Sequence, residues 1–254
     1  MKKALLKYAL LGVLVYLLAV IALLPASYTY SRALPYLPKT LPLALHDLDG
    51  SLWSGRANTL AWRSTPLGAL QWKLSPWSLL GGQLALDVLL QDSDTHITSH
   101  AVITRDGAIT LHNVNARLPA AQLLLFNTGL PIAVDGTIAV DLDEARLPQQ
   151  GAPVLHGTIV WSRALLVAGQ PLKLGDLRLT LQAGNNGGTS GILADSGGPL
   201  EINGSVVLDA NRTYRAEAKL RARPDADTSL RNSLQFLGRP DGRGYYALRY
   251  NGRL

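Results

Sequence analysis

Four side chains that could bind a metal ion lie close together in the segment Gln-Asp-Ser-Asp-Thr-His-Ile-Thr-Ser-His. They are Asp92, Asp94, His96 and His100. On a strand, even-numbered positions share one face, and carboxylates with imidazoles suit zinc or manganese. The same composition is typical of a polar hairpin tip, and the chain offers no distant fourth ligand of clear identity. We therefore predict no metal site and no cofactor.

Motifs of known catalytic chemistry are missing from the sequence. It contains no nucleophile elbow, no phosphate-binding loop and no dinucleotide-binding fingerprint. His46, His112 and His156 are isolated in the sequence, and the chain has no cysteine. The polar, glycine-flanked stretch 185–196 predicts a mobile loop. We expect no catalytic residues and a protein that is not an enzyme.

Tryptophan is concentrated in one part of the chain. Trp53, Trp62, Trp72 and Trp77 fall within 25 residues, and the fifth tryptophan is Trp161. Aromatic rings on a sheet can seal one end of a core. They can also form a protein interface, where tryptophan is enriched. The sequence alone leaves both roles open.

The N-terminal segment has the features of a membrane anchor. Three lysines within the first seven residues precede an uncharged apolar stretch that ends at Leu24, directly before Pro25. At ~1.5 Å per residue, residues 4–24 reach about 30 Å, the thickness of a hydrocarbon core. A cleaved signal peptide is the alternative, but its apolar region is shorter and its cleavage site better defined. We expect residues 1–25 to be a cytoplasmic N-terminus and a single inner-membrane span, with the bulk of the chain in the periplasm.

The charge and composition of the rest of the chain exclude several classes of protein. The proline-rich residues 26–42 predict a linker with one broken helical turn at 28–34. Beyond the first segment, 21 basic residues face 18 acidic ones, which is too small a surplus to indicate nucleic-acid binding. Disulfides are impossible without cysteine, and 24 glycines favour strands and turns. Stability must come from burial and strand pairing.

Turn signals and alternation predict a mainly β fold. Tyr214, Ala216, Ala218, Leu220 and Ala222 form one apolar face of a strand, and charged residues alternate with them. Short helices are expected at 119–126 and 227–237. Seven dipeptides favour tight turns between antiparallel strands: Asp49-Gly50, Asp106-Gly107, Asp135-Gly136, Asn186-Gly187, Asn203-Gly204, Asp241-Gly242 and Asn251-Gly252.

A repeated offset of 105 residues indicates an internal duplication. It places Pro66 over Pro171, Val102 over Val207 and Pro119 over Pro224. Two meanders of similar strand length would also look alike. We predict one membrane helix followed by a curved antiparallel sheet of two similar halves, 43–147 and 154–254, with one or two short helices.

The segment Leu48-Asp49-Gly50-Ser51-Leu52-Trp53-Ser54-Gly55-Arg56-Ala57 resembles the type II secretion system protein N family, also called general secretion pathway protein N. The resemblance continues through residues 67–76 and returns at 197–200, 234–238 and 250–254. It implies a non-enzymatic accessory subunit of the machine that exports folded proteins. It supplies no functional residue set, so Trp53, Gly55, Trp72 and Pro76 are signature positions with a structural or interface role.

Two functions follow from this resemblance and from the predicted sheet. As a secretion subunit, the chain would bind other type II secretion components, in the inner-membrane platform or the secretin, through its periplasmic sheet. As an envelope protein that handles lipid, it would hold acyl chains in a curved apolar groove. The inner membrane is a partner in both cases, lipid only in the second, and nucleic acid in neither.

Overall fold

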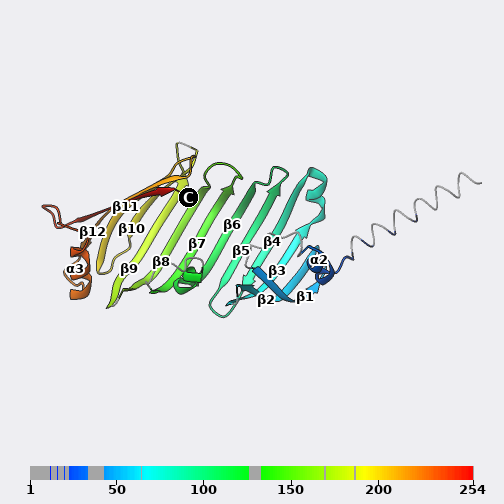
Figure 1. Ribbon diagram of the computed structural model, residues 1–254, viewed down its shortest axis with the longest axis horizontal. Helices are drawn as coiled ribbons and strands as arrows, with labels where there is room; N and C mark the ends of the chain where they lie inside the picture. The colour runs from blue at the N-terminus through cyan, green and yellow to red at the C-terminus, as the bar shows by residue number, and fades with distance from the viewer. Residues whose placement is uncertain are drawn as a thin grey trace, which may run out of the picture. The chain divides into compact units, whose positions relative to one another are not determined.

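Alternation of apolar and polar residues produces strands along most of the described chain. The computed structural model describes residues 12, 16, 20, 23–33, 43–63, 65–125, 133–168, 170–185 and 187–253. The chain divides into two units, Met1–Asp92 and Ser93–Leu254. Within each unit, strands that follow one another in sequence are neighbours in an antiparallel sheet (Figure 1).

The described residues of the first unit form four strands and two short helices. Helix α2 (Ala26–Ala33) precedes the sheet, and the 3-10 helix η2 (Pro76–Gly81) connects its last two strands. The Thr29 backbone N–H and hydroxyl both donate to the Pro25 carbonyl, at 3.1 and 3.0 Å, which closes the first turn of α2. This helix is longer than the single broken turn predicted there. The strands are β1 (Leu43–Gly50), β2 (Ser54–Trp62), β3 (Thr65–Ser75) and β4 (Gln83–Gln91).

The second unit contains nine strands in its described residues. The 3-10 helix η3 (Ala120–Leu125) follows its second strand, and helix α3 (Thr228–Gln235) precedes its last. The strands are β5 (His96–Thr104), β6 (Ile109–Pro119), β7 (Ala133–Leu147), β8 (Val154–Ala168), β9 (Gln170–Ala183), β10 (Thr189–Asp195), β11 (Leu200–Leu208), β12 (Thr213–Ala222) and β13 (Tyr246–Arg253).

The core of the second unit lies on one face of its sheet. Leu230 and Leu234 of α3 pack with Leu220 and other side chains of β8 to β12. Ala120 of η3 packs with residues of β6 and β7. Trp161 contacts both clusters, so the two helical segments cover the same face. No large side chain of the described residues is completely buried, as expected where a single sheet has no second sheet against it.

The mainly β, antiparallel fold with short helices is confirmed. Helix α3 lies within the predicted 227–237, and in β12 the even-numbered residues are the more buried, as the alternation predicts. The predicted turns at Asp135-Gly136, Asn203-Gly204 and Asn251-Gly252 are wrong, because these residues lie inside β7, β11 and β13.

The predicted mobile loop at 185–196 is also wrong. Residues 189–195 form strand β10, which pairs with β9 and β11. Thr189 is buried there, donating its hydroxyl to the Pro153 carbonyl at 2.8 Å and accepting from the Leu155 N–H at 3.0 Å. Gly191 fits between the side chains of Leu179, Leu181 and Val206. Small and polar residues are therefore compatible with this strand, because its neighbours supply the apolar surface.

The predicted membrane span, residues 4–24, lies almost wholly outside the described residues. Among the residues that are described, no helix has both the length and the apolar character needed to cross a membrane. The two similar halves and the curvature of the sheet remain predictions. Strands β3 to β7 with η3 and strands β9 to β13 with α3 follow the same order, except that η2 lies between β3 and β4 and has no counterpart between β9 and β10.

An acidic side chain in the second unit connects the loop before β13 to two strands. Glu201 of β11 accepts hydrogen bonds from Nε and Nη2 of Arg221 in β12, at 3.0 and 2.7 Å. Its other oxygen accepts from the Tyr245 hydroxyl at 2.7 Å. The guanidinium of Arg221 also lies over the Tyr245 ring, 4.4 Å from its centre. The bonds from Tyr245 and Arg221 lower the pKa of Glu201 below its usual 4.5.

We predict that Glu201→Gln removes a pH-dependent part of the stability. A lowered pKa in the folded state stabilises the fold above pH about 4.5 and loses this effect as the pH falls through the lowered value. The difference in unfolding free energy between wild type and variant should therefore shrink on acidification. Denaturant unfolding at a series of pH values measures this difference. A difference that is constant from neutral to acidic pH would contradict the role given to Glu201.

Candidate functional site: an apolar pocket under helix α2

The four signature residues predicted from the sequence lie around one end of the sheet in the first unit. Trp53 is half-buried in the β1–β2 turn, and its carbonyl accepts the Leu74 N–H at 2.6 Å. Gly55 of β2 pairs directly with Trp72 of β3. Pro76 directly follows β3 and is the first residue of η2. The structure thus brings together residues that the sequence spreads over 24 positions.

The Trp72 ring lies across the backbone of the neighbouring strand. A Cβ atom on Gly55 would lie 2.4 Å from Cζ2 of this ring, which is far closer than van der Waals contact. The indole N–H of Trp72 donates to the Leu52 carbonyl at 3.1 Å. Glycine at position 55 is therefore required by the close approach of the ring, and the ring in turn fixes the β1–β2 turn.

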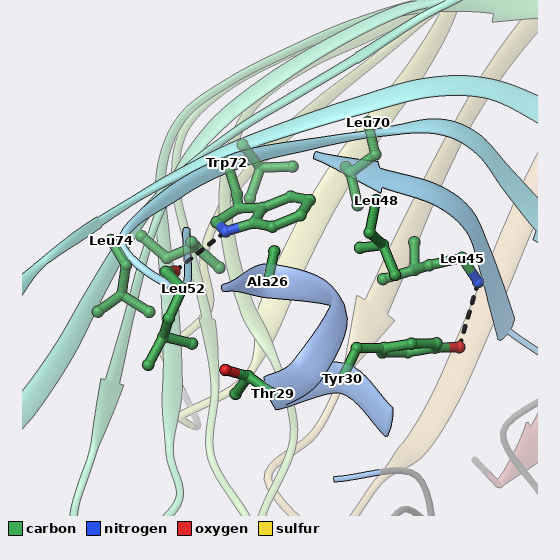
Figure 2. Close-up of a pocket in the computed structure, with 11 residues that line it drawn as sticks. Ala26, Thr29, Tyr30, Leu45, Leu48, Leu52, Leu70, Trp72 and Leu74 are labelled. Atoms are coloured by element: carbon green, nitrogen blue, oxygen red, sulfur yellow. Dashed lines mark hydrogen bonds between the residues drawn. The ribbon is translucent and has the colours of Figure 1, made fainter. Parts of the chain in front are cut away.

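An apolar pocket of about 300 Å³ lies between helix α2 and the face of the sheet to which Trp72 belongs. Figure 2 shows the indole of Trp72 and the surrounding leucines converging above α2. The lining residues are Ala26, Thr29, Tyr30, Leu45, Leu48, Leu52, Leu70, Trp72, Leu74, Leu86 and Val88.

One hydrogen bond just before α2 and one within it hold this helix over the pocket. Before the helix, the Leu52 N–H donates to the Leu24 carbonyl at 2.9 Å. Within the helix, the hydroxyl of Tyr30 accepts the Leu45 N–H of β1 at 3.2 Å, a contact drawn in Figure 2. Each bond connects α2, or the residues just before it, to the strands that form the floor of the pocket.

The chemistry of the lining limits what the pocket can do. Apart from the Tyr30 phenol, none of its lining residues is ionisable, and the only other hydroxyl is that of Thr29. The lining supplies no carboxylate, imidazole or amine, but it can take an apolar group. Its volume is near the lower end of the range for small-molecule sites.

The four residues considered as metal-ligand candidates lie in two different elements. Asp92 and Asp94 lie in the turn after β4, while His96 and His100 lie in β5. The His100 ring is 6.3 Å from the ring of His112, its partner in β6. Among the residues described, no group of three or more His, Asp or Glu side chains could hold a metal ion.

Most of the pocket was not predicted from the sequence. The strands that form its floor could have been predicted, because Leu70, Trp72 and Leu74 occupy alternate positions of β3 and therefore share a face. Leu86 and Val88 do the same along β4. The contribution of α2 has no comparable signal, because three prolines follow it within nine residues and suggest an extended chain.

Antiparallel sheets with short helices make the chain a mainly β protein, and in the first unit the sheet carries an apolar pocket. The family model for type II secretion system protein N matches residues 42–249. The chain therefore belongs to the type II secretion system protein N family, a component of the secretion machinery, and the predicted resemblance is confirmed.

Named relatives cover nearly the whole chain. The type II secretion system protein N of Aeromonas hydrophila is 30% identical over 252 residues, which is 97% of each chain. That of Vibrio cholerae is 28% identical over 97% of this chain and 98% of its own length. That of Klebsiella pneumoniae is 26% identical, with 91% and 93% covered. No solved structure matches the chain.

We predict that Gly55→Ala destabilises the first unit by about 1 to 3 kcal/mol, because the added methyl group overpacks against the Trp72 ring. Gly81→Ala is the matched control, since a Cβ there meets no atom within 4 Å. Thermal unfolding of the full chain in detergent measures both variants. Equal melting temperatures for the two would show that the Trp72 ring does not restrict position 55.

Proposed function

We propose that the chain is a non-enzymatic subunit of the type II secretion machinery, anchored in the inner membrane with its β-sheet units in the periplasm. The observation that carries the proposal is family membership along almost the whole chain. The orientation is supported by three lysines before the apolar stretch, since cations favour the cytoplasmic side. The mainly aliphatic lining of the described pocket, without carboxylate, imidazole or amine, supports a role in binding rather than catalysis.

Strand β13 is the surface that we assign to another secretion component. Among the described strands it pairs with β12 only, so one row of its backbone groups has no strand partner. Such an edge can accept a further strand from another chain. Most of its side chains are exposed, including Leu248 and Tyr250, which add apolar surface beside the edge.

We predict that a photo-crosslinking residue at Arg249 of β13 captures a type II secretion component in living cells. Ser205 of β11 is the matched control, since it is also exposed and lies in the same row of the sheet, two strands away from the edge. Mass spectrometry identifies the product. The edge assignment is contradicted if Ser205 gives the same product as Arg249, or if neither gives one.

The subunit role itself has a separate test. Deletion of the gene should leave exported proteins in the periplasm, because a subunit of the machine is missing. Normal secretion of every substrate by the deletion strain would contradict the proposed function, whatever the crosslinking result.

The pocket under α2 favours a second function, the holding of a lipid acyl chain. Its lining is almost entirely aliphatic and aromatic, and its first lining residue, Ala26, follows the predicted span by two positions. A chain of methylene groups would bury apolar surface there without leaving a polar group unpaired.

We predict that native mass spectrometry of the gently purified full chain detects one bound lipid, and that Leu86→Trp abolishes it by filling the pocket. Ile192→Trp is the control, because Ile192 is 61% exposed and lies in the second unit. Lipid that remains bound to Leu86→Trp as to the wild type would exclude the pocket as its site.

A further inference from the structure

The 3-10 helix η2 exposes three large apolar side chains within four residues. Trp77 is 79% exposed, Leu80 is 81% exposed, and Leu79 between them is 44% exposed. Contiguous apolar side chains on the surface mark sites of contact with a protein or a membrane. No residue of η2 is buried, so described side chains of the sheet leave Trp77 and Leu80 largely uncovered.

Hydrogen bonds around η2 fix this outward arrangement. The hydroxyl of Ser78 donates to the Ser75 carbonyl at 2.7 Å and accepts the Ala85 N–H at 3.0 Å, so Ser78 faces the sheet. Gly82 ends the helix in the left-handed region, with φ at 73°, and its N–H donates to the Leu79 carbonyl. With Ser78 turned inward, the neighbouring Trp77 and Leu79 must point away from the sheet.

The end of the predicted membrane span lies at the same end of the sheet. The carbonyl of Leu24, its last residue, accepts the N–H of Leu52 in the β1–β2 turn, and Pro25 forms a β-bridge with Ser51. The next residue of that turn, Trp53, bonds to Leu74, two positions before η2 begins. The chain thus enters the first unit beside the helix that exposes Trp77.

We propose that Trp77, Leu79 and Leu80 insert into the surface of the lipid bilayer that the predicted span crosses. This inference rests on the membrane anchor of the proposed function. Tryptophan is enriched at the boundary between lipid and water, where its ring is apolar and its N–H can still meet water. Insertion would give the first unit a second attachment to the membrane besides its span, and would hold the pocket under α2 close to the lipid.

Because the chain has no cysteine, single labels can test the insertion. We would label Trp77→Cys, Leu80→Cys and Thr65→Cys with an environment-sensitive fluorophore, in the full chain reconstituted into phosphatidylethanolamine and phosphatidylglycerol vesicles. Thr65 is the control, because it is exposed at the end of β3 that is opposite η2. Since β3 has 11 residues, Thr65 lies about 35 Å from η2. Labels at 77 and 80 should show blue-shifted emission and quenching by nitroxide-bearing lipids, while the label at 65 should be quenched by aqueous iodide.

Each other outcome overturns the inference. Labels at 77 and 80 that iodide reaches as readily as the label at 65 would show that η2 lies in water. Labels shielded from iodide and also from nitroxide lipids would show that protein, such as a second copy of the chain, covers η2. Carbonate extraction of the same vesicles tests the membrane anchor separately from the insertion of η2. A chain that carbonate extracts has no membrane span, whereas a chain that stays in the vesicles keeps its span even if η2 lies in water. Leu80→Cys keeps the test valid if Trp77→Cys does not fold.

Discussion

In the part of the chain that the structure describes, the fold depends on strand pairing in a sheet that has no second sheet packed against it. In each unit, the backbone hydrogen bonds of one strand are satisfied by the strand before it and the strand after it in sequence. Side chains on the apolar face can be buried only by short helices or by aromatic rings that reach across neighbouring strands. This explains why α3, η3 and Trp161 share one face, and why Trp72 lies against the backbone at Gly55.

The same constraint explains the glycines inside strands. Gly252 of β13 lies opposite Tyr214, and a Cβ there would lie 2.6 Å from the tyrosine oxygen. Gly136 of β7 has φ at 109°, and a Cβ there would lie 2.5 Å from the Ser162 carbonyl oxygen and 2.9 Å from the indole nitrogen of Trp161. These two glycines allow the close approach of a neighbouring strand or of its aromatic ring, and neither lies in a turn.

These pairs also show what the sequence could and could not reveal. Alternation along β12 and the cap and spacing of α3 identify those elements directly, because both signals are local. An Asn-Gly dipeptide has one local preference, the turn, but at 251 and 252 the contact with Tyr214 decides the conformation instead. Helix α2 and the pocket under it depend on two hydrogen bonds between residues far apart in the sequence. The Leu52 N–H donates to the Leu24 carbonyl and the Leu45 N–H donates to the Tyr30 hydroxyl, and no local pattern encodes either.

The order of the strands has a consequence for how each unit acquires its structure. Within each unit, every described strand but the last pairs with the next one along the chain, so no strand waits for a partner from a distant part of the sequence. Most connections between these strands are short and cheap to close, and the two longer ones, after β6 and β12, contain η3 and α3. Each hairpin can therefore form as soon as its own residues have been delivered, and the growing sheet offers an edge to the strand that arrives next. A chain built in this way can fold from its N-terminal end while the remainder is still being synthesised or moved.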